Sequence, residues 1–183
     1  QALLSDTTGR ESVAVGRNAL RTQNDTTSSS TYNTAVGAQA GYAITTGTNN
    51  TLIGGLAGDS LTDADFNVAI GTSALSADTL GSRSVAIGRN ALATQNFTSA
   101  TTTYNIAIGF NAGLSVTTGT QNTLIGGLAG DAITTASNNT AVGYASLSAN
   151  TTGYNNTAVG KSSLTTNTTG VNNTAHGLGA LQV

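Results

Sequence analysis

The sequence contains no Cys, Met, Pro or Trp among its 183 residues, and only 8% of its residues are charged and 4% aromatic. Without Cys, disulfides and thiolate metal sites are excluded. Because large side chains are so scarce, we do not expect an ordinary packed globular core. Without Met the chain has no initiator residue, so we expect a processed product or an excerpt of something longer.

Basic residues and long apolar runs are also scarce. The net charge is -2 and the isoelectric point is near 4.9, which leaves no basic surface to follow a phosphate backbone. No apolar run approaches the ~20 residues that a membrane-spanning helix needs. We therefore expect neither a nucleic-acid partner nor membrane insertion of this segment.

What the sequence does contain is a short repeat. A polar residue, a β-branched residue, Ala or Leu, an aliphatic residue and Gly follow one another ten times, with His176 in the aliphatic place of the last copy. We call the final residues of these copies the ruler glycines. They are Gly16, Gly37, Gly54, Gly71, Gly88, Gly109, Gly126, Gly143, Gly160 and Gly177.

The spacing of the ruler glycines is regular at two levels. The numbers of successive ruler glycines differ by 17, except that Gly16 to Gly37 and Gly88 to Gly109 each span 21. The whole pattern, including its long coil, recurs with a 72-residue period, as from Gly16 to Gly88. We therefore expect one repeat array over residues 1–183, with super-repeats at 16–87 and 88–159 and a partial one at 160–183.

A 17-residue unit predicts a parallel β-solenoid. At ~3.3 Å per residue the unit is long enough for two short strands and two turns, and too short for helical repeats of ~34 to 47 residues. We predict an all-β chain, a β-roll of about ten such coils that includes two extended, 21-residue coils. A glycine seven positions before six of the ruler glycines, such as Gly47, predicts a tight turn with positive φ.

Stacked coils place equivalent residues in columns at ~4.8 Å. Asn stands four positions before the ruler glycine in eight coils, where an amide can hydrogen-bond to the next amide. The expected asparagine ladder consists of Asn33, Asn50, Asn67, Asn105, Asn122, Asn139, Asn156 and Asn173.

Both faces of the expected strands are apolar, since Val13 and Val15 share one face and Ala14 lies on the other. The interior of the roll covers only one of these faces. We therefore expect lateral self-association about an axis along the rod. Neither end of the sequence shows an obvious cap, so we also expect either continuation in a longer chain or end-to-end stacking into a fibre.

The strings Asn156-Thr157-Ala158-Val159-Gly160 and Ser84-Val85-Ala86-Ile87-Gly88 resemble the head repeats of trimeric autotransporter adhesins. They are equally similar to the Asn-Thr-Ala-Val-Gly arrays of phage tail fibres and large bacterial surface proteins. This resemblance covers essentially the whole chain. It implies a left-handed parallel β-roll, a homotrimer, and attachment to a host or surface receptor, which could be a glycan.

Residues for catalysis or metal binding are few. His176 is the only histidine and Glu11 the only Glu, so neither a catalytic triad nor a glycosidase carboxylate pair is expected. Asp59, Asp63 and Asp65 form the densest acidic cluster, for which a solvated loop is a better reading than a Ca²⁺ site. We therefore expect no enzyme activity, no cofactor and no metal.

Binding is the remaining class of function. Tyr32, Tyr104, Phe66 and Phe97 flank the long loops or the strand starts and are candidate surface contacts for a sugar or receptor, or alternatively shield the edge of the roll. We expect a non-enzymatic structural or adhesive segment of an extracellular fibre or adhesin, on a cell surface or virion. A phage tail-fibre shaft is the first alternative. An ice-binding solenoid is the second, although Val68, Val85 and Ile106 interrupt its column of Thr.

Overall fold

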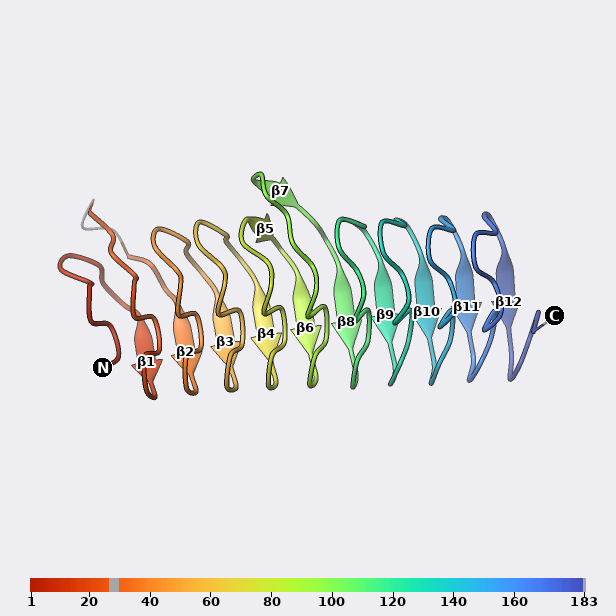
Figure 1. Cartoon of the computed structure of the whole chain (residues 1–183), viewed down its shortest axis with the longest axis horizontal. Coiled ribbons are helices and arrows are strands. Elements are labelled where there is room, and N and C mark those ends of the chain that lie inside the picture. The colour runs from red at the N-terminus through yellow and green to blue at the C-terminus, as the bar shows by residue number, and fades with distance from the viewer. Residues whose placement is uncertain (27–29, 183) are drawn as a thin grey trace.

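The computed structural model describes residues 1–26 and 30–182 and shows a row of similar coils (Figure 1). Each complete coil contributes one three-residue strand to a single ten-stranded sheet, in the order β1-β2-β3-β4-β6-β8-β9-β10-β11-β12. The prediction of a parallel β-solenoid with 17-residue spacing is confirmed. The strands are β1 (Val13–Val15), β2 (Thr34–Val36), β3 (Thr51–Ile53), β4 (Val68–Ile70), β6 (Val85–Ile87), β8 (Ile106–Ile108), β9 (Thr123–Ile125), β10 (Thr140–Val142), β11 (Thr157–Val159) and β12 (Thr174–His176).

All neighbouring strands of this sheet are parallel and in register. Thr123 pairs with Thr140 across a 17-residue coil, and Val85 pairs with Ile106 across a 21-residue coil. The insertion that lengthens a long coil is therefore accommodated outside the sheet. In the first long coil part of this insertion falls on residues 27–29, outside the described residues.

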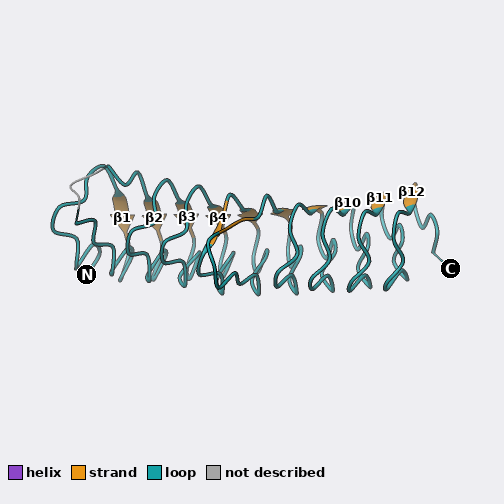
Figure 2. Ribbon diagram, turned by 90° about the horizontal axis from the view of Figure 1, so that it is seen from above, coloured by secondary structure: helices purple, strands orange, loops and turns teal. Residues whose placement is uncertain are grey.

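Most coils in the described part of the chain contain only one strand, although a 17-residue unit is long enough for two. Apart from β5 (Gly81–Ser82) and β7 (Thr101–Thr102), which pair at the second insertion, the side of the coil opposite the sheet consists of turns and loops (Figure 2). Residues with positive φ interrupt this side, for example Asn111 at 55° and Gly113 at 58°. Because an extended chain has negative φ, alternate left-handed residues prevent a second ladder. Within the described ranges, no helix is long and apolar enough to cross a membrane.

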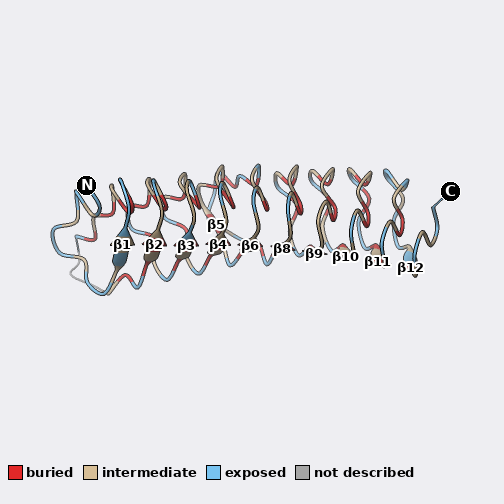
Figure 3. Cartoon of the chain, turned by 90° about the horizontal axis from the view of Figure 1, so that it is seen from below, coloured by how far each residue is buried: buried red, intermediate tan, exposed pale blue. Residues whose placement is uncertain are grey.

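The interior of the solenoid is narrow and filled with small side chains. The middle residue of each strand points inward and is Ala in eight strands and Leu in β3 and β9. Ala35, Leu52 and Ala107 are fully buried. Buried residues recur in coil after coil along the rod (Figure 3). A narrow interior explains why so few aromatic residues occur, since a large ring has no space between the two sides.

Packing inside each coil follows a size rule. Gly58 has Leu61 three positions later, and a Cβ added to Gly58 would lie 2.8 Å from both Leu61 Cδ1 and Leu52 Cδ2. Leu92, in contrast, has the buried polar residue Gln95 three positions later. Each coil therefore inserts one large aliphatic side chain, either four or seven positions after its ruler glycine. The pairs are Leu3/Asp6, Leu20/Gln23, Leu75/Asp78, Leu92/Gln95, Leu147/Asn150 and Leu164/Asn167, against Gly41/Ile44, Gly58/Leu61, Gly113/Val116 and Gly130/Ile133.

Glycine is required at the ruler position for two reasons. Gly71 has a φ of +129°, and a Cβ there would lie 2.7 Å from the carbonyl carbon and oxygen of Gly88 in the next coil. An L side chain is therefore strained in its own backbone and also collides with neighbouring backbone. The ten ruler glycines thus allow each coil to stack directly on the next one.

The turn glycines have a different role from the one expected. None of the six, including Gly47, has a positive φ, which falls instead on the residue two positions later, such as Asn49 at 59°. A Cβ on Gly47 would lie 2.5 Å from the carbonyl oxygen of Ala64. Close approach to the next coil, as at Gly47, or to a side chain of the same coil, as at Gly81, therefore favours glycine at this position, rather than turn geometry.

Replacing a ruler glycine in the middle of the rod should cost more stability than replacing the last one. Gly177 has a φ of +122° like the others, yet its added Cβ meets nothing within 4 Å. Gly71→Ala and Gly177→Ala therefore share the backbone strain and differ in the collision. We expect Gly71→Ala to lower the free energy of unfolding by about 1 to 3 kcal/mol more than Gly177→Ala in chemical denaturation. Equal losses would contradict the stacking constraint.

Candidate functional site

The outward face of the ten-stranded sheet is a continuous and regular surface. We call it the sheet face and define it by the first and third residues of each strand. These residues are β-branched except His176, and none carries a formal charge from β1 through β11. Val15 is 56% exposed and Ile53 is 38% exposed. The face consists of a first column, Val13, Thr34, Thr51, Val68, Val85, Ile106, Thr123, Thr140, Thr157 and Thr174, and a third column, Val15, Val36, Ile53, Ile70, Ile87, Ile108, Ile125, Val142, Val159 and His176.

The asparagines identified in the sequence lie inside the coil, next to the start of each strand. The Oδ1 atom of Asn33 accepts hydrogen bonds from the backbone N–H of Asn50 at 2.9 Å and from its Nδ2 at 3.1 Å. The Nδ2 of Asn50 also donates to the carbonyl oxygen of Ala64 at 2.8 Å. Equivalent bonds connect Asn50 to Asn67, and a second series runs from Asn105 to Asn173.

The two series are separated where the second insertion occurs. Ser84 takes the place of Asn, and Gln95 fills the space beside it. The Nε2 of Gln95 donates to Ser84 Oγ at 2.8 Å and to Asp78 Oδ2 at 2.6 Å, and the Oε1 of Gln95 accepts from Asn105 Nδ2 at 2.8 Å. Asp78 Oδ1 accepts the backbone N–H of Phe97 at 3.0 Å. This buried network carries the hydrogen bonding past the insertion and anchors the loop that follows.

The first insertion has the same network one super-repeat earlier. Gln23 Nε2 donates to Asp6 Oδ2 at 2.7 Å, and Asn33 Nδ2 donates to Gln23 Oε1 at 3.0 Å. Where the insertion is absent, the corresponding positions hold Asn150, Asn156 and Asn167. The combination of Ser, Asp and Gln therefore accompanies each insertion. Sequence reasoning missed this network, although the repetition of its members in successive super-repeats was visible.

Burial raises the pKa of the Asp78 carboxyl group. Desolvation is the largest cause, and hydrogen bonds from the Phe97 backbone and the Gln95 side chain oppose it. Desolvation also raises the pKa of Asp59 and of Asp131, its counterpart in the next super-repeat. These three carboxyl groups therefore favour the protonated form in the folded chain more than in the unfolded chain.

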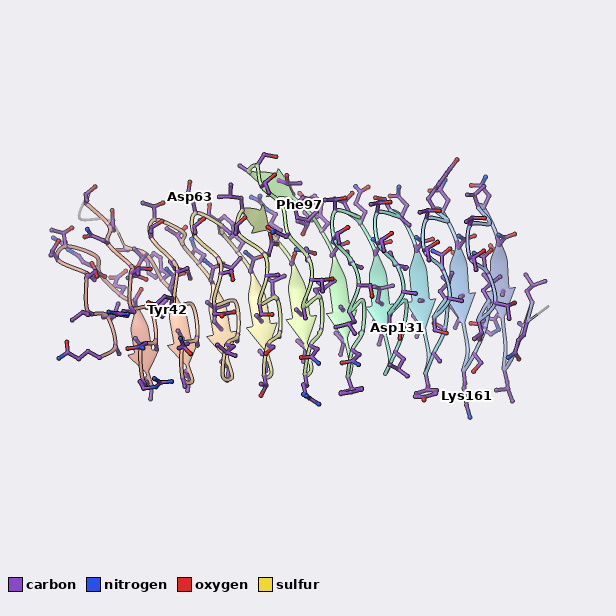
Figure 4. All side chains as sticks on the ribbon, in the orientation of Figure 1. Tyr42, Asp63, Phe97, Asp131 and Lys161 are labelled. Carbon is purple, nitrogen blue, oxygen red and sulfur yellow. The ribbon has the colours of Figure 1, made fainter. Side chains whose placement is uncertain are left out.

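The predicted surface aromatics are mostly exposed. Tyr32 and Tyr104 are each 56% exposed and Phe66 is 49% exposed. Phe97 is the exception, because it is only 7% exposed. Its N–H is bound to Asp78, so its position at the start of the inserted loop is fixed inside the fold (Figure 4). The prediction of a surface contact is therefore wrong for Phe97, and a candidate binding surface is left to the other three rings.

The acidic cluster is divided by the fold. Asp63 Oδ1 accepts a hydrogen bond from Thr46 Oγ1 at 2.5 Å, and Asp65 Oδ1 accepts one from the backbone N–H of Thr48 at 2.7 Å. Both carboxylates thus bridge adjacent coils, whereas Asp59 lies elsewhere in the coil with Oδ1 unpaired. No group of three His, Cys, Asp or Glu residues in the described part of the chain is placed to hold a metal ion. His176 lies on the sheet face at the end of β12.

The fold and these surfaces define a repeat protein of the parallel β-solenoid class. Comparisons of the chain with known protein families, with curated proteins and with solved structures return no match.

Replacing Asp78 should change how stability depends on pH. The pKa of Asp78 is raised above its unfolded value of about 3.9, so the stability it contributes is complete below that pH and is lost as the pH rises through the folded-state pKa. We expect Asp78→Asn to lose less stability than wild type over this rise, measured by denaturation at a series of pH values. Thr118→Asn, at an exposed position that carries no titratable group, is the control and should follow wild type. Parallel profiles for Asp78→Asn and wild type would refute the assignment.

Proposed function

We propose that this chain is a non-enzymatic, rigid segment of an extracellular fibre or adhesin, and that it associates laterally with further copies of itself through the sheet face. One observation carries the proposal: an uncharged face of β-branched side chains runs the length of the sheet from β1 to β11 and is partly open to solvent. Uncharged faces of this extent are typical of surfaces that other protein covers. The resemblance to trimeric adhesin heads favours three copies.

Rigidity supports the fibre role. Each coil is joined to the next by a strand pairing in the sheet, and across the 17-residue coils also by asparagine side chains inside the coil. On the opposite side, Thr hydroxyls donate to carbonyl oxygens of the following coil, as from Thr117 to Thr134 at 3.2 Å and from Thr134 to Thr151 at 3.1 Å. Bending the rod would have to break several of these columns together. Such a chain is suited to hold two ends at a fixed distance.

The side chains of the sheet face are also suited to association. Val, Ile and Thr have few χ1 rotamers, and a sheet restricts them further. They consequently lose little conformational entropy when a partner covers them. A face without formal charge also has no ion to desolvate when it is buried. These properties lower the cost of association through the sheet face.

A charge on the sheet face should dissociate the assembly. We expect wild type to sediment at a multiple of the 18.0 kDa chain mass, three times that mass by the resemblance. Ile108→Lys places an ammonium group in the middle of the face and should shift the protein to monomer, because an unpaired buried charge costs several kcal/mol. Thr118→Lys, at an exposed position outside the sheet, is the matched control and should leave the mass unchanged. A monomeric wild type would overturn the proposal.

A second candidate function is the ordering of water on the same face. Thr123, Thr140, Thr157 and Thr174 stand at the first position of four consecutive in-register strands. Their hydroxyl-bearing column lies beside a column of Ile and Val, so polar and apolar groups alternate regularly on a rigid surface.

The ice-binding alternative makes its own prediction. Thermal hysteresis at micromolar protein should appear if the Thr column organises water, and should fall when Thr140→Lys interrupts the column. Absence of thermal hysteresis in the wild-type protein would eliminate this candidate without affecting the fibre proposal.

A further inference from the structure

We propose that the edge of the rod bearing Phe66, Arg83 and Tyr104 is a binding site for an acidic oligosaccharide. This inference rests on the proposed adhesive function and names its ligand class. The three residues occupy the same position, five places before the ruler glycine, in the coils of β4, β6 and β8. These strands are direct neighbours in the sheet, so the three side chains follow one another along the rod axis at about 4.8 Å per coil.

The backbone at this position disfavours bulky residues. Phe66, Arg83 and Tyr104 have φ values of 59°, 64° and 51°, in the left-handed region. In four other coils Asn occupies the position, and Asn adopts this conformation more readily than most residues. Two aromatic residues and an arginine are thus held where the fold alone favours Asn. The backbone therefore does not explain why these three residues are found at this position.

Arg83 is positioned without an anionic partner. Its guanidinium carbon lies 5.0 Å from the centre of the Phe66 ring, and its Nη1 donates to Thr102 Oγ1 at 3.3 Å. Thr102 belongs to β7, the strand that projects above the row of coils (Figure 1). Arg83 forms no ion pair with any described residue, and its side chain is exposed. The ring and the loop therefore hold a guanidinium group whose other N–H donors can bind a carboxylate in a bidentate manner.

The surroundings of Arg83 favour a sugar as the carrier of that carboxylate. Phe66 is 49% exposed and Tyr104 56% exposed, and Arg83 lies over one face of the Phe66 ring. The exposed parts of both rings can contact the apolar face of a ligand ring. The neighbouring positions of this edge, Asn49 and Gln121, are amides that can donate to and accept from hydroxyl groups. Rings, amides and a single cation together fit a chain of hydroxylated rings that carries carboxylates.

The equivalent positions elsewhere in the array lack this combination and provide matched controls. One super-repeat earlier, Glu11 stands in the place of Arg83 and would repel a carboxylate. One super-repeat later, Asn138 and Asn155 stand in the places of Phe66 and Arg83, and Asn172 follows in the next coil. These three asparagines have φ values of 61°, 57° and 58°, so the same backbone accepts either set of side chains.

The first experiment removes the site. Hexagalacturonate is titrated into wild type, Arg83→Asn and Phe66→Asn by isothermal titration calorimetry, with cellohexaose as the neutral probe and hexaglutamate as the acidic peptide probe. We expect wild type to bind hexagalacturonate and neither of the other two probes. Arg83→Asn should raise the dissociation constant for hexagalacturonate by at least about tenfold, because a charge-assisted hydrogen bond is lost. The proposal would be overturned if wild type does not bind hexagalacturonate at millimolar concentration. It would also be overturned if hexaglutamate binds equally well, or if Arg83→Asn binds hexagalacturonate as tightly as wild type does.

The second experiment transfers the site. Asn138→Phe, Asn155→Arg and Asn172→Tyr combined supply the same three side chains in coils that lack the insertion carrying Thr102. Because the aromatic ring still lies beside the arginine, we expect a second hexagalacturonate molecule to bind per chain, more weakly than the first. A stoichiometry that stays at one would contradict the assignment of binding to these side chains. Ile108→Lys separates this inference from the fibre proposal, because it should abolish association and leave hexagalacturonate binding intact.

Discussion

The direct stacking of each coil on the next, at a distance that leaves no space for a Cβ on the ruler glycine, is the constraint on which the rest of the structure depends. Because the coils stack, each side chain lies beside the same or a similar side chain of the next coil. A residue type is therefore suitable only if two copies of it can lie side by side. Carboxylates and ammonium groups fail this requirement, whereas an amide both donates and accepts. Asn in the interior and only 8% charged residues in the chain are consequences of that rule.

The insertions show how the same constraint tolerates variation. Strand pairing continues from Val85 to Ile106 despite the longer connection. The longer connection instead changes the interior of the coil, where the regular series of Asn side chains cannot continue. Ser84, Asp78 and Gln95 replace it with a local network that satisfies the same donors and acceptors. A buried carboxyl group is retained there because it accepts several N–H donors at the base of the loop.

Much of the fold could be predicted from the sequence, because spacing alone determines which residues stack. The glycine period indicated the parallel sheet, and the position of Asn relative to Gly indicated its column. The second side of the coil could not be predicted, since left-handed residues such as Leu92 and Leu128 carry no compositional signal for positive φ. The pairing of Gly58 with Leu61 depends on side-chain volumes across the interior, which periodicity does not measure.

The candidate sites were less predictable than the fold. The aromatic residues could be selected by type, yet whether each is exposed depends on the path of the inserted loop. Phe97 is covered and Phe66 is open, although both precede a strand region. The spacing places Arg83 and Phe66 in one column, but only the structure shows that the guanidinium group lies over the ring.

The preserved register across both the shorter and the longer coils has a consequence for how such a chain can change over time. Unequal recombination that adds or removes whole units leaves every remaining coil with a neighbour of matching pitch. The length of the rod can therefore increase or decrease in steps of one coil while the chain still folds. Loop residues between the units are free to diversify, so length and recognition can be selected separately.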